Sequence, residues 1–298
     1  GNLRFSDVAP TAGVLGSGWG MGAVAADYDN DGDTDVYVTC LQNNQLFRNE
    51  NGRFSEIAAQ SGVNVDQWST GAAFGDYDLD GDLDLYVADY ITFDTTAVQH
   101  LGTQWKGVPS FVGPLGLRAQ HDHLLRNDDG RFIDVSGPAG VADVAPGYGL
   151  GVLFADIDTD GDPDIYVAND SSPNFLFRND AGTFVDISLT AHASHGAMGN
   201  AQAGMGVAMG DFDADGAPDL LVTNFDDDYN TLYHNEGAGG FEDVSFSSGI
   251  GQPALAFVGF GAIFLDFDHD ARLDIFVANG HVYPQIDTSG TNSTYAQH

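Results

Sequence analysis

The stretch Asp27-Tyr-Asp-Asn-Asp-Gly-Asp-Thr-Asp35 recurs along the chain and decides the fold. The further copies are Asp76-Tyr-Asp-Leu-Asp-Gly-Asp-Leu-Asp84, Asp156-Ile-Asp-Thr-Asp-Gly-Asp-Pro-Asp164, Asp211-Phe-Asp-Ala-Asp-Gly-Ala-Pro-Asp219 and Asp266-Phe-Asp-His-Asp-Ala-Arg-Leu-Asp274. Successive copies start 49, 80, 55 and 55 residues apart, so the second interval carries an insertion at about residues 90–120. A repeat of this length is typical of solenoids and propellers.

Short β-prone runs flank every acidic stretch in the same order. A glycine-punctuated apolar run such as Gly20–Ala26 precedes it, and a run such as Val36–Val38 follows it. A third run of the type Leu46-Phe-Arg-Asn49 and a fourth of the type Phe54-Ser-Glu-Ile57 complete the unit. Four short strands at a pitch of about fifty residues indicate propeller blades. We therefore expect an all-β fold, a single β-propeller domain over residues 1–298 with five four-stranded repeats and an irregular last blade.

The two ends of the chain bear on ring closure. A copy of the fourth-strand motif, Phe5-Ser-Asp-Val8, precedes the first acidic loop, whereas no copy of the third-strand motif follows Gly280. Pairing of residues 5–8 with the last blade would leave no long unpaired edge. Three accounts fit: a five-bladed ring with an irregular final blade, part of a larger propeller, or an open blade filled by a neighbouring molecule.

The spacing of the aspartates predicts a calcium site in each loop between first and second strands. Carboxylates at loop positions one, three, five and nine, with the backbone carbonyl of position seven, supply the oxygen ligands that Ca²⁺ prefers. An EF-hand is excluded, because position twelve is valine in every loop and β runs replace the flanking helices. The candidate ligands are Asp27, Asp29, Asp31, Asp33 and Asp35; Asp76, Asp78, Asp80, Asp82 and Asp84; Asp156, Asp158, Asp160, Asp162 and Asp164; Asp211, Asp213, Asp215, Ala217 and Asp219; and Asp266, Asp268, Asp270, Arg272 and Asp274.

Position six of the loop should be glycine, because the chain must turn sharply around the ion. Four loops obey this rule, and the fifth has Ala271 instead. Alanine in left-handed geometry costs about 1 to 2 kcal/mol, so we expect four to five bound ions, with the fifth site weakest. At about 10 μM affinity in millimolar calcium, each ion would stabilise the fold by roughly 2.7 kcal/mol.

Charge and composition limit the classes of partner. The chain has 44 acidic and 9 basic residues, a formal net charge of −35, which argues against nucleic acid as a partner. Five calcium ions would reduce that charge to −25. One cysteine excludes an internal disulfide framework, and the longest uncharged apolar stretch, residues 254–265, is too short to span a bilayer.

The repeats resemble FG-GAP (VCBS) repeats, as in the integrin α-subunit head, and more closely the cartilage-acidic-protein-like family, whose members often carry an ASPIC/UnbV domain. The resemblance rests on Gly18-Trp-Gly-Met-Gly22, Trp68-Ser-Thr-Gly-Ala-Ala-Phe74, Gly107-Val-Pro109, Gly113-Pro-Leu-Gly116, Val167-Ala-Asn-Asp170, Pro173-Asn174, Val222-Thr-Asn-Phe225 and Ala278-Asn-Gly-His-Val-Tyr-Pro284. In that family a further repeat and the terminal domain usually follow the Asn-Gly-His segment. The resemblance implies a calcium-stabilised propeller of the extracellular space, secreted or at the cell surface, and names no ligand.

The face opposite the calcium loops is the expected ligand face. It should carry Trp19, Trp68, Tyr148, residues 226–229, His281 and the insertion, which could equally pack over the mouth of the ring. The leading interpretation is a non-enzymatic binding or adhesion module for a protein or glycan. The alternatives are a structural subunit that self-associates by strand exchange and a polysaccharide-acting enzyme, although no catalytic carboxylate pair or nucleophile motif stands out.

Two histidine pairs have spacings that a transition metal could use. They are His121 with His123 and His192 with His195. The sequence places no third ligand near either pair, so both are weak candidates.

Overall fold

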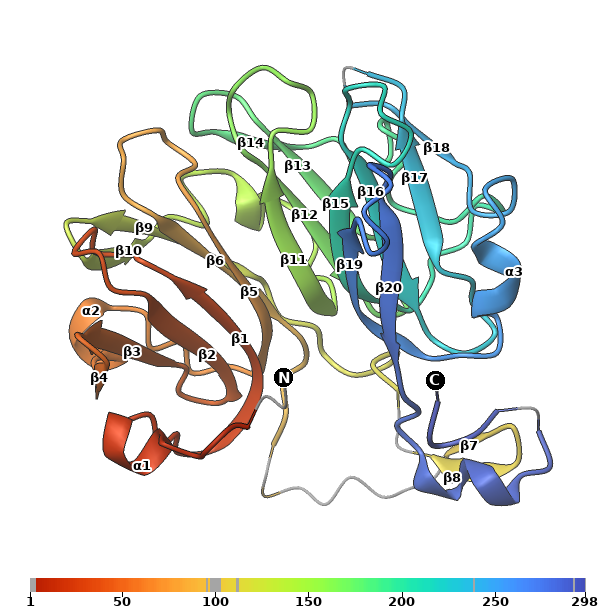
Figure 1. The fold of residues 1–298 in the computed structure, drawn as a ribbon, viewed down its shortest axis with the longest axis horizontal. Coiled ribbons are helices and arrows are strands. Elements are labelled where there is room, and N and C mark those ends of the chain that lie inside the picture. Colours follow the sequence, from red (N-terminus) through yellow and green to blue (C-terminus); the bar gives the residue numbers. More distant parts are fainter. Residues whose placement is uncertain are drawn as a thin grey trace.

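The computed structural model describes residues 4–94, 96, 103–110, 113–237, 239–291 and 293–297. Parts of the predicted insertion, residues 95, 97–102 and 111–112, lie outside the described residues. The fold is nearly all β, with four antiparallel four-stranded sheets that follow one another along the chain and a fifth sheet of two strands (Figure 1). No helix in the described part is long and apolar enough to serve as a membrane span.

Each of the first four sheets is one sequence repeat. The strands are β1 (Trp19–Ala26), β2 (Asp35–Leu41), β3 (Gln45–Glu50) and β4 (Arg53–Glu56); β5 (Ser69–Gly75), β6 (Asp84–Asp89), β9 (His123–Asp128) and β10 (Arg131–Asp134); β11 (Gly149–Ala155), β12 (Asp164–Asn169), β13 (Phe175–Asn179) and β14 (Phe184–Asp186); β15 (Gly204–Gly210), β16 (Asp219–Asn224), β17 (Thr231–Asn235) and β18 (Phe241–Asp243). Within each sheet the strands pair in chain order, which confirms the predicted blade. Every acidic loop connects the first and second strands of its sheet, as predicted.

The fifth sheet contains only β19 (Gly259–Leu265) and β20 (Asp274–Asn279). Their pairing repeats the register of the other first and second strands, with Leu265 opposite Asp274. No third strand pairs with β20 within the described residues. Within the described residues, the last blade consists of its first and second strands, which is the irregularity observed.

The sheets stack face to face through their first strands. β1, β5, β11, β15 and β19 lie side by side in that order, and the cores between successive sheets consist of apolar residues from both faces. The second strands β6, β12 and β16 are buried along their whole length because a sheet covers each side. β1 and β20 stand at the two ends of this fan and do not share a sheet (Figure 1).

Of the three accounts of ring closure, the structure does not show pairing of Phe5-Ser-Asp-Val8 with the last blade. Residues 4–8 form no strand, and Phe5 is 94% exposed. The segment leads into α1 (Ala9–Ala12), whose following residue Gly13 lies against β4, so close that a Cβ there would come within 2.4 Å of Phe54 O. It therefore lies beside the first sheet and leaves the last one open.

Short helices and the insertion complete the fold. They are α2 (Ala58–Ser61), η1 (Val141–Asp143), α3 (Gly251–Ala254) and η2 (Pro284–Thr288), with the insertion hairpin β7 (Thr103–Trp105) and β8 (Val108–Ser110). The hairpin leaves the second sheet and packs near η2, at the far end of the fan (Figure 1).

Candidate metal centres

The first aspartate of each loop closes the turn. In the first loop the two carboxylate oxygens of Asp27 accept hydrogen bonds from the backbone N–H groups of Asp31 and Gly32, both at 3.0 Å. Gly32 has a φ of 94° and Asn30 a φ of 58°, so the turn needs two left-handed residues. The glycine was expected from the sequence. The left-handed residue at position four was not, because its identity differs in every loop: Asn30, Leu79, Thr159, Ala214 and His269.

The last aspartate of each loop ties the loop to its own sheet. Asp84 is fully buried, and its oxygens accept hydrogen bonds from the N–H groups of Tyr77 (3.1 Å) and Asn127 (2.8 Å). Burial raises the pKa of Asp84 to about 7, and the same effect raises the pKa of Asp35 and of Asp164 to about 6. These carboxylates are costly to ionise where they lie, because two N–H groups do not offset the loss of water.

Positions one, three and nine converge in the first four loops. One carboxylate oxygen from each residue lies within 4.8 Å of the other two in the sets Asp27, Asp29 and Asp35; Asp76, Asp78 and Asp84; Asp156, Asp158 and Asp164; and Asp211, Asp213 and Asp219. Such a group of anions repels itself unless a cation lies between them.

Buried oxygens without partners test whether a cation fits. Asp29 Oδ1, Asp78 Oδ1 and Asp158 Oδ1 are all buried, and none of them accepts a hydrogen bond from the described residues. Each belongs to position three of its loop, the middle member of the converging set. An all-oxygen donor set with unsatisfied carboxylate oxygens suits a hard cation such as Ca²⁺, and offers none of the nitrogen or sulfur ligands that zinc prefers.

The carboxylates at positions five and seven accept hydrogen bonds from backbone N–H groups. Asp80 Oδ1 accepts the N–H of Asp82 at 2.9 Å, and Asp82 Oδ2 accepts the N–H of Asp129 in the turn between the third and fourth strands at 3.0 Å. Asp162 makes the same contact with Ala181 at 2.9 Å. The side chain of position seven thus holds a neighbouring turn, and the structure does not bring it to the converging carboxylates.

The fourth and fifth loops depart from the pattern. In the fourth, His234 Nε2 lies 3.0 Å from Asp213 Oδ2, at the place where the other third strands carry arginine. In the fifth, Ala271 has a φ of 68°, as the sequence led us to expect, and the Arg272 guanidinium pairs with Asp270. That pairing holds the pKa of Asp270 below its usual range, and places a positive charge in the fifth loop.

The third-strand asparagine is a further structural residue of the site, which the sequence showed only as part of a repeated motif. Asn127 Nδ2 donates hydrogen bonds to Leu83 O in its own loop (3.1 Å) and to Tyr28 O in the preceding loop (2.9 Å). Asn179 and Asn235 repeat both contacts one and two sheets further on. Each of the first three loops is thereby fixed to the next sheet.

A second candidate site lies at the other end of the first strands. A cavity of about 550 Å³ opens there, with a mostly apolar and aromatic lining that includes Trp19, Trp68, Tyr90, Phe93 and Tyr283. The first strands run from this cavity to the metal loops, a distance of about 20 Å at 3.3 Å per residue. The predicted ligand face therefore has a hollow, and it contains Trp19 and Trp68 as expected.

The insertion hairpin packs beside that hollow. The Trp105 ring lies 5.5 Å from the ring of Phe225 and 5.2 Å from that of His281, and Lys106, the single lysine of the sequence, binds Asp226 (2.9 Å) and Asp227 (2.8 Å). Residues 226–227 and His281 thus anchor the insertion.

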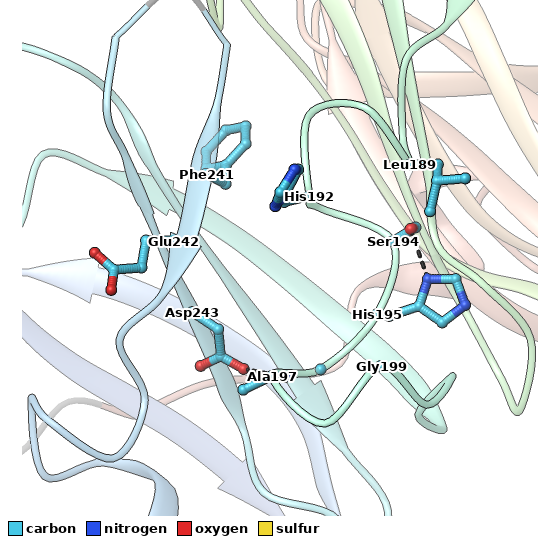
Figure 2. Close-up of a pocket in the computed structure, with 10 residues that line it drawn as sticks. Leu189, His192, Ser194, His195, Ala197, Gly199, Phe241, Glu242 and Asp243 are labelled. Atoms are coloured by element: carbon cyan, nitrogen blue, oxygen red, sulfur yellow. Dashed lines mark hydrogen bonds between the residues drawn. The ribbon is translucent and has the colours of Figure 1, made fainter.

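The candidate histidines lie in two different surroundings. His123 Nδ1 lies 2.7 Å from the buried Asp89 Oδ2, a contact within the second sheet. His192 and His195 line a separate cavity of about 680 Å³, and Figure 2 shows their rings well apart. Ser194 Oγ lies 2.7 Å from His195 Nδ1. Asp243, on the same wall, instead accepts hydrogen bonds from Tyr229, Ala197 and Ser245.

Comparison with known proteins points to one family. A family model described as "FG-GAP-like repeat" matches residues 27–87, 156–222 and 211–277, which together are more than half of the chain. Cartilage acidic protein 1 of Mus musculus is 35% identical over 150 residues, and that of Homo sapiens 36% identical over 150 residues. Each match covers 49% of this chain, but only 22% of the mouse and 21% of the human protein.

Two solved structures align with most of this chain at low sequence identity. A lectin of Agrocybe aegerita that recognises non-reducing terminal N-acetylglucosamine is 16% identical, with a TM-score of 0.44 over 87% of this chain and 60% of that one. The rhamnogalacturonan lyase YesW is 10% identical, with a TM-score of 0.40 over 87% of this chain and 55% of that one.

Proposed function

The chain belongs to the FG-GAP-like repeat family, and we propose that it is a calcium-stabilised, non-enzymatic binding module of the extracellular space. One observation carries the proposal: position three of successive loops presents a buried carboxylate oxygen with no hydrogen-bond partner, beside two further carboxylates. A cation bound between the three carboxylates would satisfy the unpaired oxygen and offset their negative charge. The repetition of the cluster in loop after loop argues for structural ions rather than for one catalytic metal.

The proposed location follows from the ion. Calcium sites in modules outside the cell have dissociation constants up to about 10⁻⁴ to 10⁻³ M, and a site in that range fills only where calcium is millimolar. A net charge of −35 also disfavours a compact fold unless cations are bound. A secreted or cell-surface protein meets both conditions.

The aromatic cavity is the proposed ligand site. Trp19 is 76% exposed at its rim, and Trp68 Nε1 is buried without a hydrogen-bond partner among the described residues. A ligand with an apolar face would stack on the exposed rings that line the cavity. The flat face of a sugar ring and an apolar protein side chain both have this chemistry, so a glycan or a protein is the proposed ligand class.

A paired measurement tests ion and ligand separately. Native mass spectrometry in millimolar calcium should show four or five bound ions, and a protein that keeps no calcium would refute the structural ion. A printed glycan array and an array of extracellular protein ectodomains should then yield binders that are lost on Trp19→Ala but kept on Phe5→Ala, an even more exposed aromatic outside the cavity. Binding that ignores Trp19→Ala would refute the cavity as the site.

A further inference from the structure

The aromatic cavity contains a single charged residue. Asp170 is the one acidic residue in its lining, and among the described residues no lysine, arginine or histidine lines it. Asp170 Oδ2 accepts a hydrogen bond from Tyr90 Oη (2.6 Å), and Asp170 Oδ1 accepts one from Ser171 Oγ (2.7 Å). Because Tyr90 itself lines the cavity, the carboxylate stands at the edge of the aromatic lining.

This carboxylate lacks a compensating positive charge. Its hydrogen-bond donors are hydroxyl groups, and no basic side chain in the described part of the chain pairs with it. Burial raises the pKa of Asp170, because water is removed from the charged form. Lys106 binds Asp226 and Asp227 instead. Burial, and then the charges of Asp227 and Asp170, raise the pKa of Asp228 as well, so negative charge is in excess around Asp170.

The aromatic rings of the lining stand at steep angles to one another. The centroid of the Trp68 ring lies 5.6 Å from that of Tyr90 and 5.1 Å from that of Phe93, at interplanar angles of 74° and 77°. Aromatic rings set in this way around a hollow resemble the cages that bind ammonium ions, because the face of each ring carries partial negative charge. Rings and carboxylate together suit a cation better than a neutral group, which would leave Asp170 without a counter-charge.

The lining offers few free acceptors for the N–H groups of an ordinary ammonium ion. Each oxygen of Asp170 already accepts one hydrogen bond, and Tyr90 Oη is the donor of one of them. Thr70 Oγ1 lies 2.7 Å from Gly149 O and 3.1 Å from Ala88 O. A primary ammonium brings three donors that need acceptors, whereas a quaternary ammonium brings none. A fully methylated cation therefore suits this lining better than the side chain of an unmodified lysine or arginine.

We propose that the aromatic cavity binds a quaternary ammonium group that has no anion beside it, with Asp170 as the counter-charge. The inference rests on the proposed function, since it names the chemistry of the ligand at the same site. A phosphate or carboxylate next to the cation would find no basic partner among the lining residues that the structure describes. The volume of about 550 Å³ is in the range that holds a drug-sized molecule, so the ammonium group is one end of a larger ligand.

Choline and its neutral carbon analogue, in which a carbon atom replaces the nitrogen, are the matched probes. In millimolar calcium, a chemical-shift titration should give an affinity for choline at least about tenfold higher than for the analogue. Asp170→Asn should lower the choline affinity at least about fivefold and leave that of the analogue within about twofold, because only choline carries charge. Asp66→Asn removes the same charge at an exposed position outside the cavity and should change neither affinity. Trp19→Ala should weaken both probes.

Two further ligands identify what carries the cation. Phosphocholine should bind at least about fivefold more weakly than choline, because its phosphate lacks a basic partner in the lining. A peptide with one trimethyl-lysine between uncharged residues should bind more tightly than choline if a protein carries the cation, and more weakly if a small molecule does. Either order keeps the ammonium site and decides its source.

Three results would overturn the proposal. Equal affinity for choline and its carbon analogue would make the cavity a purely apolar site. Equal loss of choline binding on Asp66→Asn and on Asp170→Asn would assign the attraction to net charge. Array binders that need Trp19 but are not displaced by saturating choline would uphold the cavity as the ligand site and exclude a quaternary ammonium group as what it binds.

Discussion

Asn127 Nδ2 donates a hydrogen bond of 2.9 Å to the carbonyl oxygen of Tyr28, which lies 99 residues earlier in the chain and in the metal loop of the preceding sheet. Tyr28 also packs against Phe132 of that next sheet, with ring centroids 5.7 Å apart. Backbone geometry in one acidic loop therefore depends on a side chain from the sheet that follows it.

Asn127→Ala should weaken the fold by about 2 kcal/mol, because it leaves the carbonyl oxygens of Tyr28 and Leu83 without their donor. Urea unfolding in saturating calcium measures the change. The matched control is Asn64→Ala, a substitution of the same type at an exposed position. The stability of this variant should stay within about 0.5 kcal/mol of that of the parent protein. Equal effects at the two sites would show that the inter-sheet hydrogen bond is not important.

Asp78→Asn should remove one calcium ion from the native mass spectrum. The residue supplies the unpaired buried oxygen of the second loop, and an amide there keeps the shape but loses the charge. Asp66→Asn, a substitution of an exposed aspartate outside the loops, should leave the ion count unchanged. If Asp78→Asn keeps every ion, the converging carboxylates are not the ligands.

The double substitution Ala271→Gly with Arg272→Asp should raise the calcium affinity of the fifth loop. Glycine relieves a left-handed alanine, at a gain of about 1 kcal/mol, and the second change removes the guanidinium that neutralises Asp270. We expect calcium affinity at this loop to rise about tenfold, as measured by calorimetric titration against the parent protein. A titration curve identical to that of the parent would mean that the loop does not bind calcium in either form.

Stability without calcium should fall as the pH rises. Burial raises the folded-state pKa of Asp35 and Asp164 to about 6 and that of Asp84 to about 7, above the ordinary value of 3.8, so the folded state binds protons more tightly than the unfolded chain. This contribution is fully present below pH 3.8 and is lost as the pH rises through about 6 to 7. Calcium binding to the ionised carboxylates should reverse the trend.

Thermal unfolding between pH 4.5 and 7.5, in chelator and in millimolar calcium, measures both slopes. Asp84→Asn should flatten the chelator profile, because the amide does not titrate in this range. A chelated protein that is more stable at pH 7.5 than at pH 4.5 would contradict the assignment.

Local sequence patterns predicted the sheets and loops well. The acidic loop, the third-strand Leu-x-Arg-Asn type of motif and the fourth-strand phenylalanine each recur at fixed spacing, so every blade repeats the same prediction. The position of Ala271 in the left-handed region was also predictable, because the other loops have glycine there. These features depend on contacts within one repeat.

Features that depend on contacts between distant segments could not be predicted in the same way. Phe5-Ser-Asp-Val8 has the sequence of a fourth strand, but its position beside β4 depends on where the first sheet stands in the fan. The docking of Trp105 on Phe225 joins residues 120 positions apart with no repeated motif on either side. The hydrogen bond from Asp129 N–H to the side chain of Asp82 was not predicted, because the sequence assigned only the backbone carbonyl of this position a role.

The hydrogen bond from each third-strand asparagine to the loop before it gives the molecule a direction. Every metal loop from the first to the third is secured by the sheet that comes after it, while the fourth and fifth lack that support within the described residues. In a nearest-neighbour array, units at an unsupported end open first. Chelation should therefore remove ions in order from the last loop towards the first. Unfolding would then proceed along the array of sheets in one direction.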